Sequence, residues 1–171
     1  EQIPFLQKAI IKECRRQGKF CIVATEMLES MKKNSRPTRA EVSDIANAVM
    51  NGTDAVMLSG ETTTGKFPSE TVKYMADICE EAEKHLEYSI NIEAASRDIA
   101  GAIAASVVET SNLLDAKLIV AATMSGLTAK LISNLKPRSL ILASTPSEKV
   151  ARSLALNAGV YPVLTEEYSS T

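Results

Sequence analysis

Apolar and polar residues along the chain follow two alternating patterns, one typical of buried strands and one of amphipathic helices. Short apolar runs rich in β-forming residues predict strands at 20–25, 54–59, 117–122, 139–144 and 160–164. Longer stretches with helical apolar spacing predict helices at 3–18, 38–51, 68–85, 97–114, 129–135 and 147–159. Strands and helices that alternate in this way are typical of parallel α/β units joined by right-handed crossovers.

Two of the predicted helices begin with a capping box, in which a hydroxyl and a carboxylate satisfy free backbone amides. Thr38 and Glu41 have the required spacing at the start of one helix. Thr145 and Glu148 repeat this spacing, with Pro146 at the expected first helical position. Both helix starts therefore follow from short local patterns.

The composition is that of a globular protein and gives no indication of a highly charged partner. Of the 171 residues, 45% are apolar and 23% are charged, with a net charge of −2. We therefore expect neither nucleic acid nor a membrane as partner, and no apolar run approaches the roughly 20 residues that span a bilayer. Because the chain does not begin with Met, we expect it to be a piece of a longer protein.

The cysteine and histidine content excludes two common kinds of site. Three unpaired cysteines, Cys14, Cys21 and Cys79, indicate free thiols in a reducing compartment such as the cytoplasm. No Cys/His cluster has zinc-site spacing. The single histidine, His85, lies in a charged helical stretch, where we expect a solvated side chain rather than a member of a Ser-His-Asp triad.

Three loops follow predicted strands and are candidates for chemistry, because parallel α/β folds bind ligands at the carboxyl ends of their strands. They span residues 25–38, 59–67 and 123–128. The second loop resembles a phosphate-binding P-loop through residues 60–66. Phe67 stands where that motif needs a hydroxyl for magnesium, and Pro68 delays the following helix, so both residues argue against the P-loop interpretation.

Hydroxyl side chains are the main chemical groups that these loops offer. Thr25 and Ser59 end two successive strands, which indicates a shared site, although a capping serine is an alternative for Ser59. In the third loop, hydroxyls lie around Gly126 before a helix, and an anion site and a simple helix cap are equally compatible with this pattern. The hydroxyl residues of this loop are Thr123, Ser125 and Thr128.

Residues 24–62, ATEMLESMKKNSRPTRAEVSDIANAVMNGTDAVMLSGET, closely resemble a segment of the pyruvate kinases. The similarity continues through KFPSETVKYMADICEEAE and, more weakly, through the remainder of the chain. The resemblance implies an α/β fold: residues 1–86 would form the last two strand-helix units of a (β/α)8 barrel. Residues 87–171 would form the first part of a parallel three-layer α/β regulatory domain, after a charged hinge near 81–95.

The resemblance also implies an activity, its cofactors and its partners. Pyruvate kinases transfer a phosphoryl group from phosphoenolpyruvate to ADP, with Mg2+ and usually K+, and are cytoplasmic tetramers of glycolysis. Thr25 would contact the substrate near the place where the enolate is protonated, and Ser59 would lie in the outer part of the pocket. Residues that would close the pocket or meet a neighbouring subunit, unless they form only a solvated charge cluster, are Glu29, Arg36 and Arg39. Residues that would hold a phosphate of an allosteric sugar phosphate or nucleotide are Thr123, Ser125, Gly126 and Thr128.

The departures from the family pattern limit what the chain can do alone. Glu26 stands where the family usually has Gln, and Thr64 stands where animal enzymes have Lys. The catalytic lysine and the Mg2+ ligands would lie on strands before residue 1, so we expect the isolated chain to be inactive. Two strands cannot close an eight-stranded barrel, so we also expect exposed apolar surface that favours self-association.

Three alternatives remain open at this point. The chain could be a stand-alone module that binds sugar phosphates or other anions without catalysis, an unrelated nucleotide binder, or an excised segment in which only the regulatory half is informative. The effector, whether fructose bisphosphate, AMP or a ribose phosphate, cannot be assigned from these residues.

Overall fold

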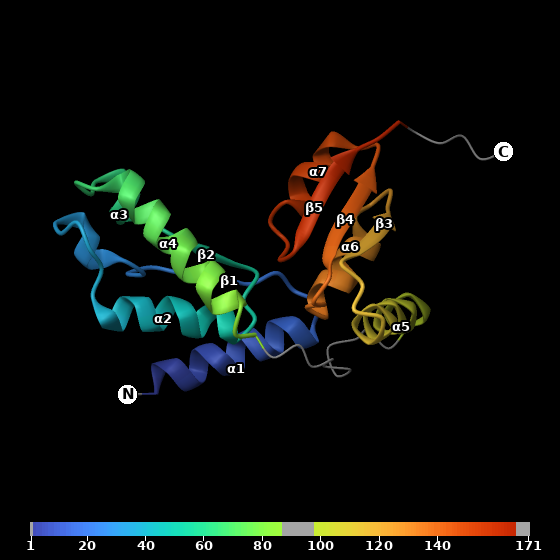
Figure 1. Ribbon diagram of the computed structural model, residues 1–171, viewed down its shortest axis with the longest axis horizontal. Helices are drawn as coiled ribbons and strands as arrows, with labels where there is room; N and C mark the ends of the chain where they lie inside the picture. The colour runs from blue at the N-terminus through green and yellow to red at the C-terminus, as the bar shows by residue number, and fades with distance from the viewer. Residues whose placement is uncertain (1, 87–97, 167–171) are drawn as a thin grey trace. The chain divides into compact units, whose positions relative to one another are not determined.

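The computed structural model describes residues 2–86 and 98–166, which fall into two compact units (Figure 1). Unit 1 comprises residues 1–12 and 21–87, and unit 2 comprises residues 13–20 and 88–171. Most of the predicted hinge, and the residues just after the predicted boundary at 86, lie outside the described residues.

Unit 1 contains two short parallel strands with helices after each. β1 (Ile22–Ala24) pairs with β2 (Ala55–Met57), and Ala24 lies opposite Met57. Both strands are shorter than the apolar runs that predicted them. The helices of this region are α1 (Ile3–Arg16), η1 (Glu29–Lys32), α2 (Arg39–Met50), α3 (Gly60–Thr63) and α4 (Pro68–Glu83).

The core of unit 1 lies between the loop after β1 and the helices α2 and α4. Its buried side chains are Met27, Leu28, Met31, Ile45 and Met75. Three of these residues belong to the loop and η1, so this loop is part of the packed interior. The sequence analysis did not predict η1 or α3, which are single turns without amphipathic periodicity.

α1 forms as predicted but exposes its apolar stripe. Ile3, Leu6 and Ile10 are 74%, 56% and 59% exposed, whereas Ile11 is buried. The exposed apolar surface that we expected in the first half is therefore present, and self-association through it stays a prediction.

Unit 2 is a three-stranded parallel sheet in the order β3-β4-β5, with helices against one of its faces. The strands are β3 (Leu118–Ala122), β4 (Leu140–Thr145) and β5 (Val160–Leu164). The helices are α5 (Ile99–Leu113), α6 (Leu127–Asn134) and α7 (Glu148–Leu154). Parallel strands in two sheets, each accompanied by helices, confirm the predicted α/β fold class.

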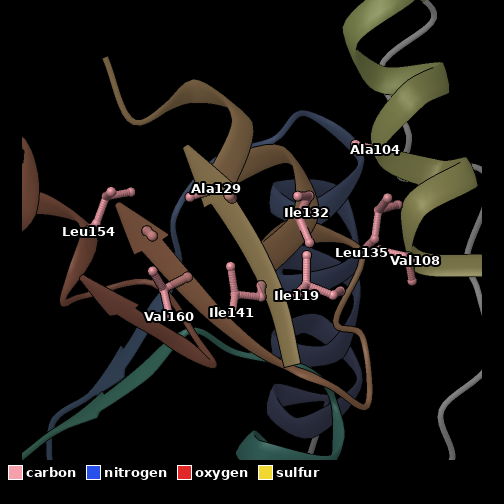
Figure 2. Close-up of a cluster of buried hydrophobic side chains, with 11 residues drawn as sticks. Ala104, Val108, Ile119, Ala129, Ile132, Leu135, Ile141, Leu154 and Val160 are labelled. Atoms are coloured by element: carbon pink, nitrogen blue, oxygen red, sulfur yellow. The ribbon is translucent and has the colours of Figure 1, made fainter. Parts of the chain in front are cut away.

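The core of unit 2 is formed by alternate residues of the sheet. Figure 2 shows Ile119 of β3, Ile141 of β4 and Val160 of β5 among side chains from the three helices. Leu118 and Val120, the neighbours of Ile119 on β3, point to the other face of the sheet and are exposed. The structure therefore shows a helix layer on one face of the sheet within the described residues.

One predicted helix start is wrong. Thr145 does not cap α7, because it is fully buried and pairs with Leu164 as the last residue of β4. Ser147 is the N-cap instead, and its Oγ accepts a hydrogen bond from the Val150 amide at 3.4 Å. Pro146 therefore precedes the cap rather than occupying the first helical position.

Candidate functional site

Thr25 and Ser59 lie at the same edge of the β1–β2 pair. The strands are parallel and end at Ala24 and Met57, which lie opposite each other, so the chain reaches Thr25 and Ser59 just beyond their carboxyl ends. Thr25 is exposed and Ser59 is partly buried. Within residues 2–86 and 98–166, neither hydroxyl makes a hydrogen bond, so both are free to contact a ligand.

The backbone at Thr25 is strained. Thr25 has φ 75° and Glu26 has φ 53°, both in the left-handed region that a β-branched threonine rarely adopts. Such strain persists only where surrounding structure holds the backbone, and it is concentrated at functional sites. The question is therefore what holds this turn in place.

Glu61 connects the loops that follow the two strands. Its side chain is 1% exposed; Oε1 accepts a hydrogen bond from the Leu28 amide at 3.1 Å, and Oε2 accepts one from the Ser59 amide at 2.8 Å. Burial would raise the pKa of this carboxyl. The amides of Glu61 itself, Ser59 and Leu28, together with the charge of Lys32, hold its pKa below the ordinary value.

This arrangement gives a physical reason to reject a P-loop in residues 60–66. A P-loop needs backbone amides that are free to bind a phosphate. Here the Thr64 amide donates to the Gly60 carbonyl and the Lys66 amide to the Lys32 carbonyl, each at 3.0 Å. A Cβ at Gly65 would collide with the Glu61 carbonyl, so this glycine serves a tight turn.

Ser59 also differs from the capping serine considered above. It directly precedes α3, but its side chain makes no capping hydrogen bond. The Ser59 carbonyl instead accepts hydrogen bonds from the hydroxyls of Thr62 and Thr63, each at 3.2 Å. The capping alternative for Ser59 is therefore wrong.

Lys32 places a positive charge beside the turn after β2. Its Nζ donates to Glu29 Oε1 at 2.7 Å, and this hydrogen bond raises the pKa of the lysine. The end of the side chain lies over Gly60, where an added Cβ would collide with Lys32 Cε and Nζ. A larger residue at position 60 would therefore displace the flexible end of Lys32.

A second carboxylate, that of Glu41, fixes the far end of the loop after β1. It accepts hydrogen bonds from the amide and hydroxyl of Ser30 at 2.7 and 2.6 Å, and from those of Thr38 at 2.7 and 2.9 Å. The predicted capping box of Thr38 and Glu41 is confirmed. Burial opposes ionisation, but these hydrogen bonds lower the pKa of Glu41.

Glu29, Arg36 and Arg39 all have exposed side chains on this loop and the start of α2. Glu29 pairs with Lys32. Neither arginine makes an ion pair in the part of the chain that the structure describes. Nothing in this geometry distinguishes a pocket-closing role or a subunit contact from a solvated charge cluster, and these roles stay predictions.

The loop after β3 belongs to unit 2 and has a different construction. Thr123 is buried, and its Oγ1 accepts a hydrogen bond from the Gly126 amide at 2.9 Å. Gly126 has φ 86° and is the N-cap of α6, so no side chain caps the helix from this position. Ser125 and Thr128 are exposed, and Ser125 Oγ accepts only a long, 3.4 Å hydrogen bond from the Leu127 amide.

This geometry is compatible with an anion at the start of α6. The exposed hydroxyls of Ser125 and Thr128 lie next to first-turn amides that carry the positive end of the helix dipole. Thr123 and Gly126 shape the turn from within. Thr128 is the first-turn hydroxyl in α6, which begins two residues earlier than the sequence predicted.

The sequence analysis did not assign a role to Lys32 or Glu61. Their contacts join residues about 30 positions apart, which local patterns do not reveal. One signal was available for Glu61: an acidic residue directly after Ser-Gly, at the end of an apolar strand.

The described residues contain no group of three or more His, Cys, Asp or Glu side chains that could hold a metal ion. No chemical step is therefore assigned to a metal held by this chain. All three cysteines are free. Within residues 2–86 and 98–166, no helix is long and apolar enough to cross a membrane.

Comparisons with known proteins identify relatives over the whole chain. The family model described as pyruvate kinase, barrel domain, matches residues 1–72, and that described as pyruvate kinase, alpha/beta domain, matches residues 101–171. The chain is 43% identical to a pyruvate kinase of Clostridium acetobutylicum, over all of this chain and 37% of the relative. It is 48% identical to a pyruvate kinase of Staphylococcus epidermidis, over all of this chain and 30% of the relative.

A solved structure shows the same similarity in three dimensions. The crystal structure of a pyruvate kinase from Cryptosporidium parvum matches with a TM-score of 0.91 and 42% identity, covering 96% of this chain and 34% of that one. The chain thus spans about a third of the length of these relatives.

Proposed function

Because the chain belongs to the pyruvate kinase family, we propose that the complete protein transfers the phosphoryl group of phosphoenolpyruvate to ADP, giving pyruvate and ATP. The observation that carries this proposal is the juxtaposition of two free hydroxyls, those of Thr25 and Ser59, at the carboxyl ends of paired parallel strands. Residues 1–86 would belong to the catalytic barrel of this cytoplasmic enzyme, and residues 87–171 to its regulatory domain.

In this proposal Thr25 acts on the enolate that remains when phosphoenolpyruvate loses its phosphoryl group. A carbon atom of the enolate must then gain a proton to give the methyl group of pyruvate. The Thr25 hydroxyl can hydrogen-bond the substrate carboxylate and relay that proton, with Ser59 in the outer part of the pocket. The strained backbone at Thr25 supports a role in which the position of its hydroxyl matters.

Mg2+ and K+ would supply the positive charge that phosphoryl transfer requires. Their ligands, and the catalytic lysine, would be contributed by parts of the complete protein other than these residues. We therefore expect no turnover from the isolated chain. Glu29, Arg36 and Arg39 are proposed to close the pocket or to contact a neighbouring subunit in a homotetramer.

The experiment is a pyruvate-formation assay on the complete protein with phosphoenolpyruvate, ADP, Mg2+ and K+. Wild-type protein should turn over, and Thr25→Ala should lower kcat by roughly 100-fold or more, because a positioned proton-transfer group contributes about that factor. Thr64→Ala, in the next loop, is the matched control because it also removes one exposed threonine hydroxyl. An inactive wild-type protein, or equal activity of the two variants, would contradict the proposal.

A second function is proposed for the loop after β3, on the observation that α6 begins with exposed hydroxyls and a glycine cap. This loop would bind a phosphate of a sugar-phosphate or nucleotide effector through Thr123, Ser125, Gly126 and Thr128. If the chain were a stand-alone anion-binding module, the same loop would carry its function. Saturable binding of fructose bisphosphate, AMP or ribose phosphate, lost in Ser125→Ala/Thr128→Ala, would support this proposal.

A further inference from the structure

Glu61 is the only buried carboxylate among the described residues, and the proposed reaction does not use it. Burying an ionised group is costly unless hydrogen bonds compensate for its lost hydration. The amides of Leu28 and Ser59 provide this compensation, at 3.1 and 2.8 Å. Since these donors come from different loops, the carboxylate joins the turn after β1 to the turn after β2.

We propose that Glu61 is a positioning residue that acts as an internal anion and holds Thr25 and Ser59 in register at the edge of the β1–β2 pair. This inference rests on the proposed function, in which the relative position of the Thr25 and Ser59 hydroxyls matters for the reaction. In this proposal Glu61 contacts no substrate; it acts through the backbone amides of Ser59 and of Leu28, three residues after Thr25.

The contact with Ser59 is direct. One carboxylate oxygen accepts a hydrogen bond from the backbone amide of Ser59, and this bond fixes the orientation of the peptide group next to the serine side chain. Loss of this hydrogen bond would release the position of the hydroxyl.

The contact with the Thr25 turn runs through Leu28. The other carboxylate oxygen accepts the amide of Leu28, a fully buried residue of the unit 1 core three positions after Thr25. The left-handed backbone at Thr25 and Glu26 therefore lies between β1 and an anchored residue. An anchor on both sides is what maintains a strained turn.

Lys32 completes the arrangement from the outside. Its ammonium lies over Gly60, and its charge favours the ionised form of Glu61. The lysine is itself hydrogen-bonded to the exposed Glu29. The two turns thus surround an ionised carboxylate with amides on one side and a cation on the other.

The test compares Glu61→Gln with Glu41→Gln in the complete protein. Glu41 is a fair control because its carboxylate also accepts hydrogen bonds from backbone amides of the loop after β1, but its partners are Ser30 and Thr38 and none lies in the turn after β2. A glutamine at position 61 can accept from one amide, but its NH2 group faces the other donor. We expect kcat to fall roughly 100-fold in Glu61→Gln and less than fivefold in Glu41→Gln, because small displacements of reacting groups cost about this much.

The KM for phosphoenolpyruvate should change less than threefold in both variants, since neither side chain contacts substrate. A second measurement starts from pyruvate and follows exchange of its methyl hydrogens for deuterium in heavy water, which reports the proton step without net phosphoryl transfer. This exchange should fall together with kcat in Glu61→Gln. If Glu61 had only a structural role, both substitutions would lower the melting temperature, and Glu61→Gln would show no selective loss of kcat and exchange.

Glu61→Asp keeps the charge but is one methylene too short to reach both amides, and it replaces Glu61→Gln if that variant does not fold. Its expected result is a folded protein with kcat again reduced by at least tenfold. Wild-type levels of kcat and exchange in the folded variant would overturn the positioning role. Inactive wild-type protein would instead overturn the proposed function itself.

Discussion

Residues 59–62, Ser-Gly-Glu-Thr, and residues 125–128, Ser-Gly-Leu-Thr, follow parallel strands in the two units and differ at one position. At that position Glu61 is buried and accepts backbone amides, whereas Leu127 is 55% exposed. The first loop therefore contains its own anion, and the second leaves hydroxyls and a helix start accessible. The side chain at this position thus separates a loop that holds its own carboxylate from a loop in which an exposed leucine lies beside exposed hydroxyls.

The glycines of the two loops lie in different surroundings. Gly60 leaves room for Lys32, whereas Gly126 has φ 86° and its added Cβ would lie 3.2 Å from side-chain atoms of Val150 and Leu154. The two loops therefore have similar sequences but pack differently. This difference suggests substitutions that act on one loop without affecting the other.

The largest effect is expected for Glu61→Ala, which leaves the amides of Leu28 and Ser59 without their acceptor. Each unsatisfied amide costs about 1–3 kcal/mol, so the loss of both acceptors should lower the free energy of unfolding by about 2–6 kcal/mol. Urea unfolding of unit 1 measures this loss. A change below about 1 kcal/mol would show that water replaces the carboxylate and that the loop is not closed.

The next effect is expected for Gly126→Ala. A left-handed backbone costs a non-glycine residue about 1–2 kcal/mol, and the Cβ would also press on Val150 and Leu154. Urea unfolding should show a loss of this size in unit 2, and Gly159→Ala is a useful control. Gly159 has φ 70° but open space around it, so the difference between the two variants isolates the packing contribution.

Leu127→Glu tests whether the second loop can be converted into the first. A carboxylate in the first turn of α6 should stabilise the helix by about 0.3–1 kcal/mol. It should also reduce binding of a phosphorylated effector at least tenfold, because it repels or replaces the anion. Leu127→Gln is the uncharged control, and equal effector affinity in both variants would contradict an anion site here.

The two loops should also differ in how their stability depends on pH. The pKa of Glu61 is lowered by folding, so its contribution is present above the pKa of the unfolded chain and is lost as pH falls through the lower, folded value. Acidification from neutral pH should therefore destabilise wild-type protein more than Glu61→Gln. Unfolding midpoints measured from pH 7 to 3 would reveal this difference, and parallel profiles would contradict an ionised Glu61.

The smallest effect is expected for Glu29→Gln. Its ion pair with Lys32 is 2.7 Å long, but the side chains are 47% and 32% exposed, and such pairs contribute about 0.2–1 kcal/mol. The same urea assay should register at most this change. A larger loss would mean that Lys32 depends on Glu29 to stay over Gly60.

Local patterns predicted most of the fold, because hydrophobic spacing and the Thr38–Glu41 box act within a few residues. They failed at Thr145, where pairing with β5 extends β4 through the expected cap. The site was only partly accessible to sequence reasoning. Thr25 and Ser59 could be placed at a strand edge, but the Leu28–Glu61 hydrogen bond spans 33 positions and requires the packed structure.

The most direct measurement is a titration of the 15N-labelled chain with inorganic phosphate, followed by amide chemical shifts in both loops. We expect saturable shifts at residues 125–128 and none at Ser59 or Glu61, whose surroundings already contain a carboxylate. Shifts at Ser59 and Glu61, with residues 125–128 unmoved, would contradict the distinction between a closed and an open loop.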